Sequence, residues 1–249
     1  LTPTSGHITY FGKDFFSNRS ECLQHVSFAS TYTSLPFVLT VEENLHCFGR
    51  LYGITNAMQI AMPLLERFGI ADKIKARVSS LSAGQITRLM LVKAFFTNPK
   101  VVLLDEPTAS LDPDVARDVC KFLLEERKRT GLSILFTSHK MEEVAELCDR
   151  VIVLKKGKLI ANDLPKNLAK SISLYRLRLT ILDNMKKTEE LARKAEIAFE
   201  TDHHYITCSL EERQIPPFLV QLMQANISYA SIQIEEPTLE DYFLQIAQK

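Results

Sequence analysis

Several features that would assign a sequence to a particular class of protein are missing here. The 249 residues carry 30 basic and 30 acidic side chains, so no excess of positive charge favours nucleic acid as a partner. No apolar run approaches the roughly 20 residues of a membrane-spanning helix, and the first residues show no signal-peptide pattern. The five cysteines include no CxxC pair, which argues against a zinc site or a disulfide framework and favours the reducing cytosol.

Glycine is scarce as well, and none of the eight glycines belongs to a phosphate-binding loop of the form G-x-x-x-x-G-K-[ST]. Such a loop needs glycines so that backbone N–H groups can surround phosphates, a lysine for their charge and a hydroxyl for Mg²⁺. The nearest match, Gly6 with Gly12 and Lys13, is one residue too long and continues with Asp14 in place of Ser or Thr. The loop is therefore absent from these 249 residues.

An apolar run that ends in two carboxylates is the most informative stretch of the chain. Residues 101–104 read Val-Val-Leu-Leu, and Asp105 and Glu106 follow directly. This pattern predicts a buried parallel strand with charge at its carboxyl end, where doubly wound sheets bind their ligands. Because hard cations prefer carboxylate oxygens, Asp105 is a candidate ligand for Mg²⁺, directly or through water. Glu106 is placed to orient or deprotonate a water that attacks a phosphate.

A helix start precedes this strand in the chain. Residues 81–85 read Leu-Ser-Ala-Gly-Gln, in which Ser82 can cap the helix and Gly84 lets the backbone approach a ligand closely. The unpaired N–H groups and the partial positive charge of a helix N-terminus suit a γ-phosphate. A helix cap alone would also explain Ser82, but the position just ahead of the acidic strand favours phosphate binding.

Two further motifs follow the acidic strand. Asp112 stands in the sequence Ser-Leu-Asp before Pro113, where a plain helix cap is a serious alternative to a functional role. His139 follows the next expected buried strand, residues 133–137, and therefore lies at the same edge of the sheet as Glu106. An imidazole at that edge can form a hydrogen bond with a γ-phosphate and orient the attacking water.

In this order and at this spacing, the four motifs resemble those of the ATP-binding subunit of an ABC transporter. Residues 81–85 are similar to the family's signature, residues 101–106 to its Walker B strand, and residues 110–112 to its D-loop. The resemblance implies that Ser82, Gly84 and Gln85 contact ATP held by a second ATP-binding subunit.

The same resemblance implies the chemistry of the remaining motif residues. Glu106 and His139 would take part in ATP hydrolysis, with Mg²⁺ held by Asp105. Asp112 would reach across the dimer of ATP-binding subunits.

The sequence departs from the family's pattern at the Q-loop. The family has a glutamine there that touches Mg²⁺ and couples to the membrane subunit, and by spacing Thr31 occupies its place. A threonine hydroxyl is shorter but can still bind a metal-bound water. The next stretch, residues 39–45, resembles the LTVxENL helix start of the family, in which Thr40 and Glu43 make a capping box.

The order of elements predicts an α/β fold in two domains. Residues 1–167 are expected to form a P-loop NTPase-like parallel sheet, truncated at its N-terminus, with a helical subdomain over about residues 40–97. After residue 167 we expect a strand at 174–182, a helix at 188–198, and then strands and helices in alternation. Residues 168–249 would form a small α+β appendage, similar to that of exporter-type subunits.

Three functions stay open at this point. The first, which the resemblance favours, is an ATP-hydrolysing subunit of an ABC exporter, peripheral to the cytoplasmic face of the membrane and paired with an integral membrane permease. The second is a shortened subunit that donates its LSAGQ signature to a partner's ATP. The third is a non-enzymatic interaction module, against which Glu106 and His139 argue. Without the phosphate loop, we expect the chain alone to be inactive as an ATPase.

Overall fold

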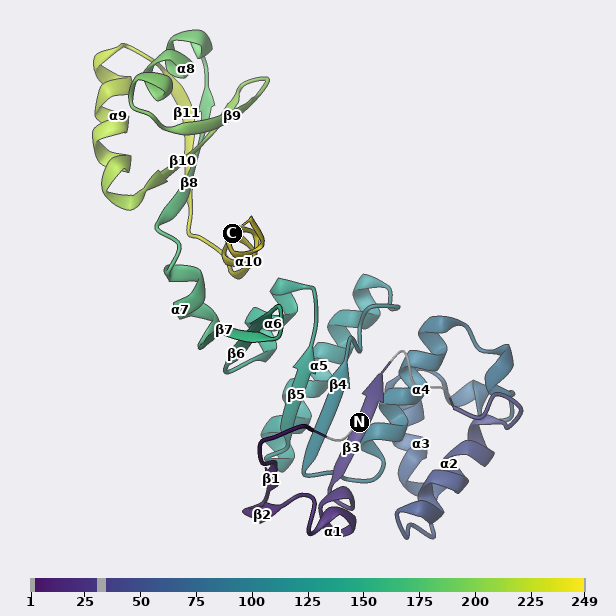
Figure 1. The fold of residues 1–249 in the computed structure, drawn as a ribbon. Coiled ribbons are helices and arrows are strands. Elements are labelled where there is room, and N and C mark those ends of the chain that lie inside the picture. Colours follow the sequence, from purple (N-terminus) through teal and green to yellow (C-terminus); the bar gives the residue numbers. More distant parts are fainter. Residues whose placement is uncertain (1–2, 31–34, 249) are drawn as a thin grey trace. The chain divides into compact units, whose positions relative to one another are not determined.

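The computed structural model describes residues 3–30 and 35–248. The chain divides into two compact units, Leu1–Glu143 and Val144–Lys249, and each is described by itself (Figure 1). The expected domain boundary after residue 167 stays a prediction. Among the described residues, no helix has both the length and the apolar character that crossing a membrane requires.

The first unit is organised around a three-stranded parallel sheet in the order β3-β4-β5 (Figure 1). The register pairs Phe28 with Leu103 and Leu103 with Leu135, so one row of apolar side chains crosses one face of the sheet. Two residues further along, at the carboxyl ends of the strands, the register places the polar residues Ser30, Asp105 and Thr137 side by side. The strands are β3 (Val26–Ser30), β4 (Val101–Asp105) and β5 (Ser133–Thr137).

The exposure of alternate residues shows that one face of this sheet is buried. Val102 and Leu104 are 0% and 1% exposed, whereas Leu135, on the opposite face, is 59% exposed. Helix α4 packs near β3, and the ring of Phe122 on α5 makes edge contacts with Phe95 of α4 at 4.9 Å. Burial of each large apolar side chain contributes about 1.5–3 kcal/mol, so this face of the sheet contributes to the unit's core.

Three helices, α2, α3 and α4, gather on the β3 side of the sheet (Figure 1), and the helical subdomain expected over about residues 40–97 stays a prediction. The Thr40 side chain accepts from the Glu43 N–H and the Glu43 side chain accepts from the Thr40 N–H, which confirms the predicted capping box. The other elements of the unit are short. Bounds are β1 (Thr9–Tyr10), β2 (Lys13–Asp14), α1 (Arg19–Leu23), α2 (Val41–Leu51), α3 (Ala57–Arg67), η1 (Ala71–Lys73), η2 (Val78–Ser80), α4 (Ala83–Phe95), α5 (Pro113–Thr130) and α6 (Met141–Leu147), which runs into the second unit.

The second unit contains a four-stranded antiparallel sheet in the order β11-β8-β10-β9, with the connectivity βαββαβ. Side chains from β8 and β10 form its buried core with α8 and α9, including Leu177, Leu179, Ile206 and Phe218. A hairpin of β6 and β7 completes the unit. Bounds are β6 (Val151–Lys155), β7 (Lys158–Asp163), α7 (Pro165–Lys170), β8 (Leu174–Ile181), α8 (Met185–Lys194), β9 (Ala198–Asp202), β10 (Tyr205–Glu211), η3 (Glu212–Gln214), α9 (Ile215–Gln224), β11 (Tyr229–Glu235) and α10 (Leu239–Gln248).

The expectation of a helix at 188–198 needs correction. Helix α8 spans Met185–Lys194, and Ala198 is already the first residue of β9, a strand that sequence reasoning missed. Glu196 between them has a φ of 55°, a left-handed conformation that ends the helix and turns the chain back toward the sheet.

Gly49 generates a first prediction, because α2 approaches the start of α3 closely there. A Cβ atom added at Gly49 would lie 2.7 Å from the Cβ of Ala57 and 3.2 Å from the carbonyl oxygen of Ile54. We expect Gly49→Ala to lower the free energy of unfolding by about 1–3 kcal/mol, although alanine is the better helix former by about 1 kcal/mol. Urea unfolding measures the change, with the exposed Cys47→Ala on the same helix as control. A higher free energy of unfolding for Gly49→Ala would show that an added methyl group fits between α2 and the start of α3.

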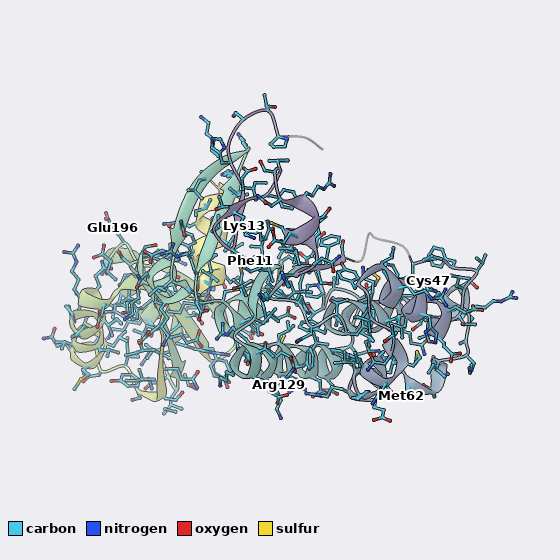
Figure 2. The ribbon with its side chains drawn as sticks, turned by 90° about the horizontal axis from the view of Figure 1, so that it is seen from below. Phe11, Lys13, Cys47, Met62, Arg129 and Glu196 are labelled. Atoms are coloured by element: carbon cyan, nitrogen blue, oxygen red, sulfur yellow. The ribbon has the colours of Figure 1, made fainter. Side chains whose placement is uncertain are left out.

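Cys208 generates a second prediction, for the core of the second unit. Burial raises the pKa of its thiol to about 12, and only the thiolate is reactive. We expect iodoacetamide at mildly alkaline pH to leave Cys208 unmodified until urea unfolds the unit, while the exposed Cys47 (Figure 2) reacts in the folded protein. Peptide mass spectrometry reads both sites, and equal rates at the two cysteines would show that the core is open.

Candidate active site

The Asp105 carboxylate is held from both neighbouring strands. Ser30 Oγ donates to Asp105 Oδ2 at 3.0 Å, and Thr137 Oγ1 donates to Asp105 Oδ1 at 2.7 Å. This arrangement follows from the register, which pairs Asp105 with Ser30 on β3 and with Thr137 on β5. The two hydroxyl groups fix the orientation of the carboxylate, and each oxygen keeps lone pairs for a metal ion or its water ligands.

Glu106 leaves the strand in a strained conformation that turns its side chain toward β5. Its φ is 51°, in the left-handed region that a glutamate rarely adopts. The Glu106 N–H lies 3.2 Å from both the carbonyl oxygen and Oγ1 of Thr137, which hold this conformation in place. Strained residues of this kind cluster at functional sites, because surrounding contacts must maintain them.

This turn brings Glu106 together with His139. Glu106 Oε2 and His139 Nδ1 are 2.8 Å apart, and the imidazole side chain is 69% exposed. A carboxylate can only accept, so the proton shared in this contact belongs to Nδ1. The predicted pair of water-activating and phosphate-contacting groups is thus adjacent to the predicted metal ligand, at the carboxyl end of the sheet.

The signature segment begins α4 and lies against the loop that follows β4. Ser82 Oγ accepts from the Gln85 N–H at 3.3 Å, and the Gln85 side chain accepts from the Ser82 N–H at 2.9 Å. A Cβ atom at Gly84 would lie only 3.1 Å from the carbonyl oxygen of Ser110. Gly84, one of the residues predicted to contact nucleotide of a second subunit, therefore lies close to the loop that ends in Asp112.

Comparison with known proteins agrees with this arrangement. The family described as "ABC transporter" matches residues 1–109. Nod factor export ATP-binding protein I of Paraburkholderia xenovorans (strain LB400) is 34% identical over 256 residues, which cover 98% of this chain and 79% of that protein. Linearmycin resistance ATP-binding protein LnrL of Bacillus subtilis (strain 168) is 27% identical over 260 residues, covering 97% of this chain and 80% of that protein. This chain belongs to the ABC transporter ATP-binding family.

A solved structure supports the fold of this ABC subunit. The structure described as the ATP binding subunit of an ABC transporter matches with a TM-score of 0.63 over 69% of this chain and 72% of that chain. At 22% sequence identity the likeness concerns the fold alone. The predicted P-loop NTPase-like α/β class is confirmed, and ATP is the nucleotide that the family binds.

The oxygen-rich setting of Asp105 fits the Mg²⁺ that accompanies ATP. Among the described residues, no group of three or more His, Cys, Asp and Glu side chains could hold a metal ion. A hard cation that keeps several waters and takes substrate phosphates as ligands needs only one or two carboxylates. Asp105 would hold Mg²⁺ in that way, with the Ser30 and Thr137 hydroxyls behind it.

The roles expected of Asp112 and Thr31 in the ABC subunit stay predictions. Asp112 stands at the N-cap of α5, yet its side chain makes no capping hydrogen bond in the described part of the chain. Only the backbone carbonyl of Asp112 caps the helix, by accepting from the Ala116 N–H at 2.9 Å in the described structure, so no side-chain hydrogen bond supports the helix-cap alternative. Thr31, predicted at the Q-loop, lies outside the described residues.

Sequence reasoning missed a polar cluster beside the Glu106–His139 pair. Thr108, which is fully buried, donates to Glu143 Oε2 at 2.7 Å, and Lys140 Nζ lies 3.1 Å from Glu143 Oε1. The ion pair of Lys140 with Glu143 could have been predicted from their spacing, since oppositely charged residues three apart can meet at the start of a helix. The hydrogen bond from Thr108 to Glu143 joins residues 35 positions apart, so no local sequence pattern could predict it.

The bridge between Thr137 and Asp105 generates a third prediction. Hydrogen bonds to charged groups contribute about 1.5–3 kcal/mol, so Thr137→Val should lower the free energy of unfolding by roughly that amount. A double-mutant cycle with Asp105→Asn isolates the pair, and we expect a coupling above about 0.5 kcal/mol. Thr207→Val, on a strand of the second unit, is the control. Additive effects of Thr137→Val and Asp105→Asn would mean that the hydroxyl does not hold the carboxylate.

Proposed function

We propose that this chain is the ATP-hydrolysing subunit of an ABC-type exporter, bound to the cytoplasmic face of a membrane through an integral permease subunit. The contact of 2.8 Å between Glu106 and His139, next to the hydroxyl-held Asp105, is the observation that carries the proposal. A subunit that only lends its signature to a partner has no use for this pair. Two similar proteins have names that refer to Nod factor export and linearmycin resistance, which favours export over import.

The mechanism assigns separate tasks to the residues at the carboxyl ends of β4 and β5. Glu106 accepts a hydrogen bond from the attacking water and aligns it with the γ-phosphate. Mg²⁺ at Asp105 would neutralise the charge that develops on the phosphate oxygens. Ser30 and Thr137 keep the Asp105 carboxylate turned toward the ligand while that charge changes.

His139 positions Glu106 and contacts the phosphate. A neutral imidazole has one N–H, and here that N–H is used on the Glu106 carboxylate. Donation from Nε2 to a phosphate oxygen therefore requires either the doubly protonated ring or release of Glu106. The exposed ring has room for both arrangements, since 69% of its side-chain surface is accessible.

The signature of this chain would act on the ATP of a second ATP-binding subunit. Its backbone N–H groups at the start of α4 and the Ser82 hydroxyl would meet the γ-phosphate there. Asp112, whose side chain makes no capping bond in the described structure, would reach the same boundary between subunits. Export would then follow from closing and opening of the dimer against the permease.

The absent phosphate loop leads to a fourth prediction. The backbone N–H array and lysine of such a loop supply most of the grip on ATP phosphates, and none of the 249 residues forms one. The polypeptide alone should show no micromolar binding of Mg²⁺-ATP in isothermal titration calorimetry. Tight binding would mean that other residues of this chain hold the phosphates.

A fifth prediction tests Glu106. In a protein that joins this chain to a segment supplying the phosphate loop, Glu106→Gln should reduce ATP turnover by roughly 10²–10⁴-fold and leave nucleotide binding intact. Glu142→Gln, an exposed acid in the first turn of α6, is the matched control. Undiminished hydrolysis in the Glu106 variant would favour the signature-donor function, in which a partner's residues cleave the ATP.

A further inference from the structure

The carboxylate of Glu143 lies between the loop that follows β4 and the loop that follows β5. Its side chain is 13% exposed, and its two oxygens accept from separate sides. Thr108 Oγ1 donates to Oε2 at 2.7 Å, Ser138 Oγ approaches the same oxygen at 3.4 Å, and the Lys140 ammonium group lies 3.1 Å from Oε1. Glu143 therefore connects residues on both sides of His139 to the residue two positions after Glu106.

Lys140 makes two further hydrogen bonds in the cluster formed by Thr108, Ser138, Lys140 and Glu143, which we call the Glu143 cluster. Its ammonium group also donates to the carbonyl oxygen of Thr108 at 3.3 Å, and its backbone N–H donates to Ser138 Oγ at 3.0 Å. The segment Ser138–Lys140 thus has two attachments to Thr108, one through the Glu143 carboxylate and one direct. His139 is the middle residue of that segment, and its ring is the part that remains exposed.

We propose that Glu143 is a positioning residue that holds His139 against Glu106. This role rests on the proposed hydrolytic function of the Glu106–His139 pair. Glu106 and His139 come from different strand ends. The ladder between β4 and β5 ends at Asp105 and Thr137, and past it the Thr137 oxygens hold the backbone N–H of Glu106. The Glu143 cluster fixes the two loops beyond those points, so the distance of 2.8 Å between the pair depends on it.

The tautomer of His139 reports this role without nucleotide. Contact with the Glu106 carboxylate keeps the proton of the neutral ring on Nδ1, and ¹⁵N chemical shifts of the imidazole distinguish Nδ1–H from Nε2–H. We expect the unmodified chain to show the Nδ1–H form. In Glu143→Ala the signal should become a mixture of tautomers, as it should in Glu106→Ala, where the partner itself is removed.

Matched variants separate positioning from folding. Thr108→Val removes the 2.7 Å contact at nearly constant volume and should produce a partial shift of the His139 signal. Glu143→Gln keeps an acceptor for Thr108 but loses the charge beside Lys140, and should retain more of the Nδ1–H form than Glu143→Ala. Glu142→Ala should leave the signal unchanged. An unchanged Nδ1–H signal in a folded Glu143→Ala or Thr108→Val protein would overturn the proposal.

Turnover gives a second readout when the phosphate loop is supplied. Misplacing a catalytic group by about 1 Å can cost roughly a hundredfold in rate, so Glu143→Ala should lower kcat by up to that factor with little change in the KM for ATP. A raised KM with normal kcat would contradict the positioning role. If no variant hydrolyses ATP while the tautomer shift is present, the proposed function fails and the positioning of His139 stands.

Discussion

The pairing of three strands at their carboxyl ends is the constraint on which the site depends. Parallel pairing in register puts Ser30, Asp105 and Thr137 in one row, and the two hydroxyls then hold the carboxylate from either side. A shift of β4 by one residue would move Asp105 to the opposite, buried face of the sheet and away from the two hydroxyls. The apolar side chains that bury that face, Val102 and Leu104, prevent such a shift because they would become exposed.

Beyond the strand ends, hydrogen bonds between the loop after β4 and the loop after β5 fix the conformation of both loops. Glu106 adopts its left-handed conformation because its N–H is held by Thr137, and the chain then continues to the buried Thr108. Glu143 ties Thr108 to the segment that carries His139. The His139 ring is therefore exposed, whereas Thr108, to which its segment is tied, is fully buried. A ligand can reach the ring without disturbing that attachment.

The sequence predicted the parts of the site that have a local pattern. Four apolar residues before Asp105 and Glu106 indicate a buried strand, and Ser82 with Gln85 and Thr40 with Glu43 have the spacing of helix caps. Strand β9 was missed because its residues are mostly exposed and show no alternation, and because Glu196 ends α8 in a conformation that glycine would usually signal. The contact of Thr108 with Glu143 could not be read locally, because only tertiary packing brings residues 35 positions apart together.

The exposure of His139 has a consequence for how hydrolysis is controlled. With 69% of its side chain in contact with solvent, water screens the field of the Glu106–His139 pair in the isolated chain. Under the proposed function, a surface that covers the pair would exclude this water and strengthen every charge–dipole interaction in the site. The signature at the start of α4 is the same kind of surface, offered outward by this chain at Ser82 and Gly84 beside the Ser110 carbonyl. Two ATP-binding subunits that exchange such surfaces would each depend on the other for a dry site, which couples hydrolysis to their closure.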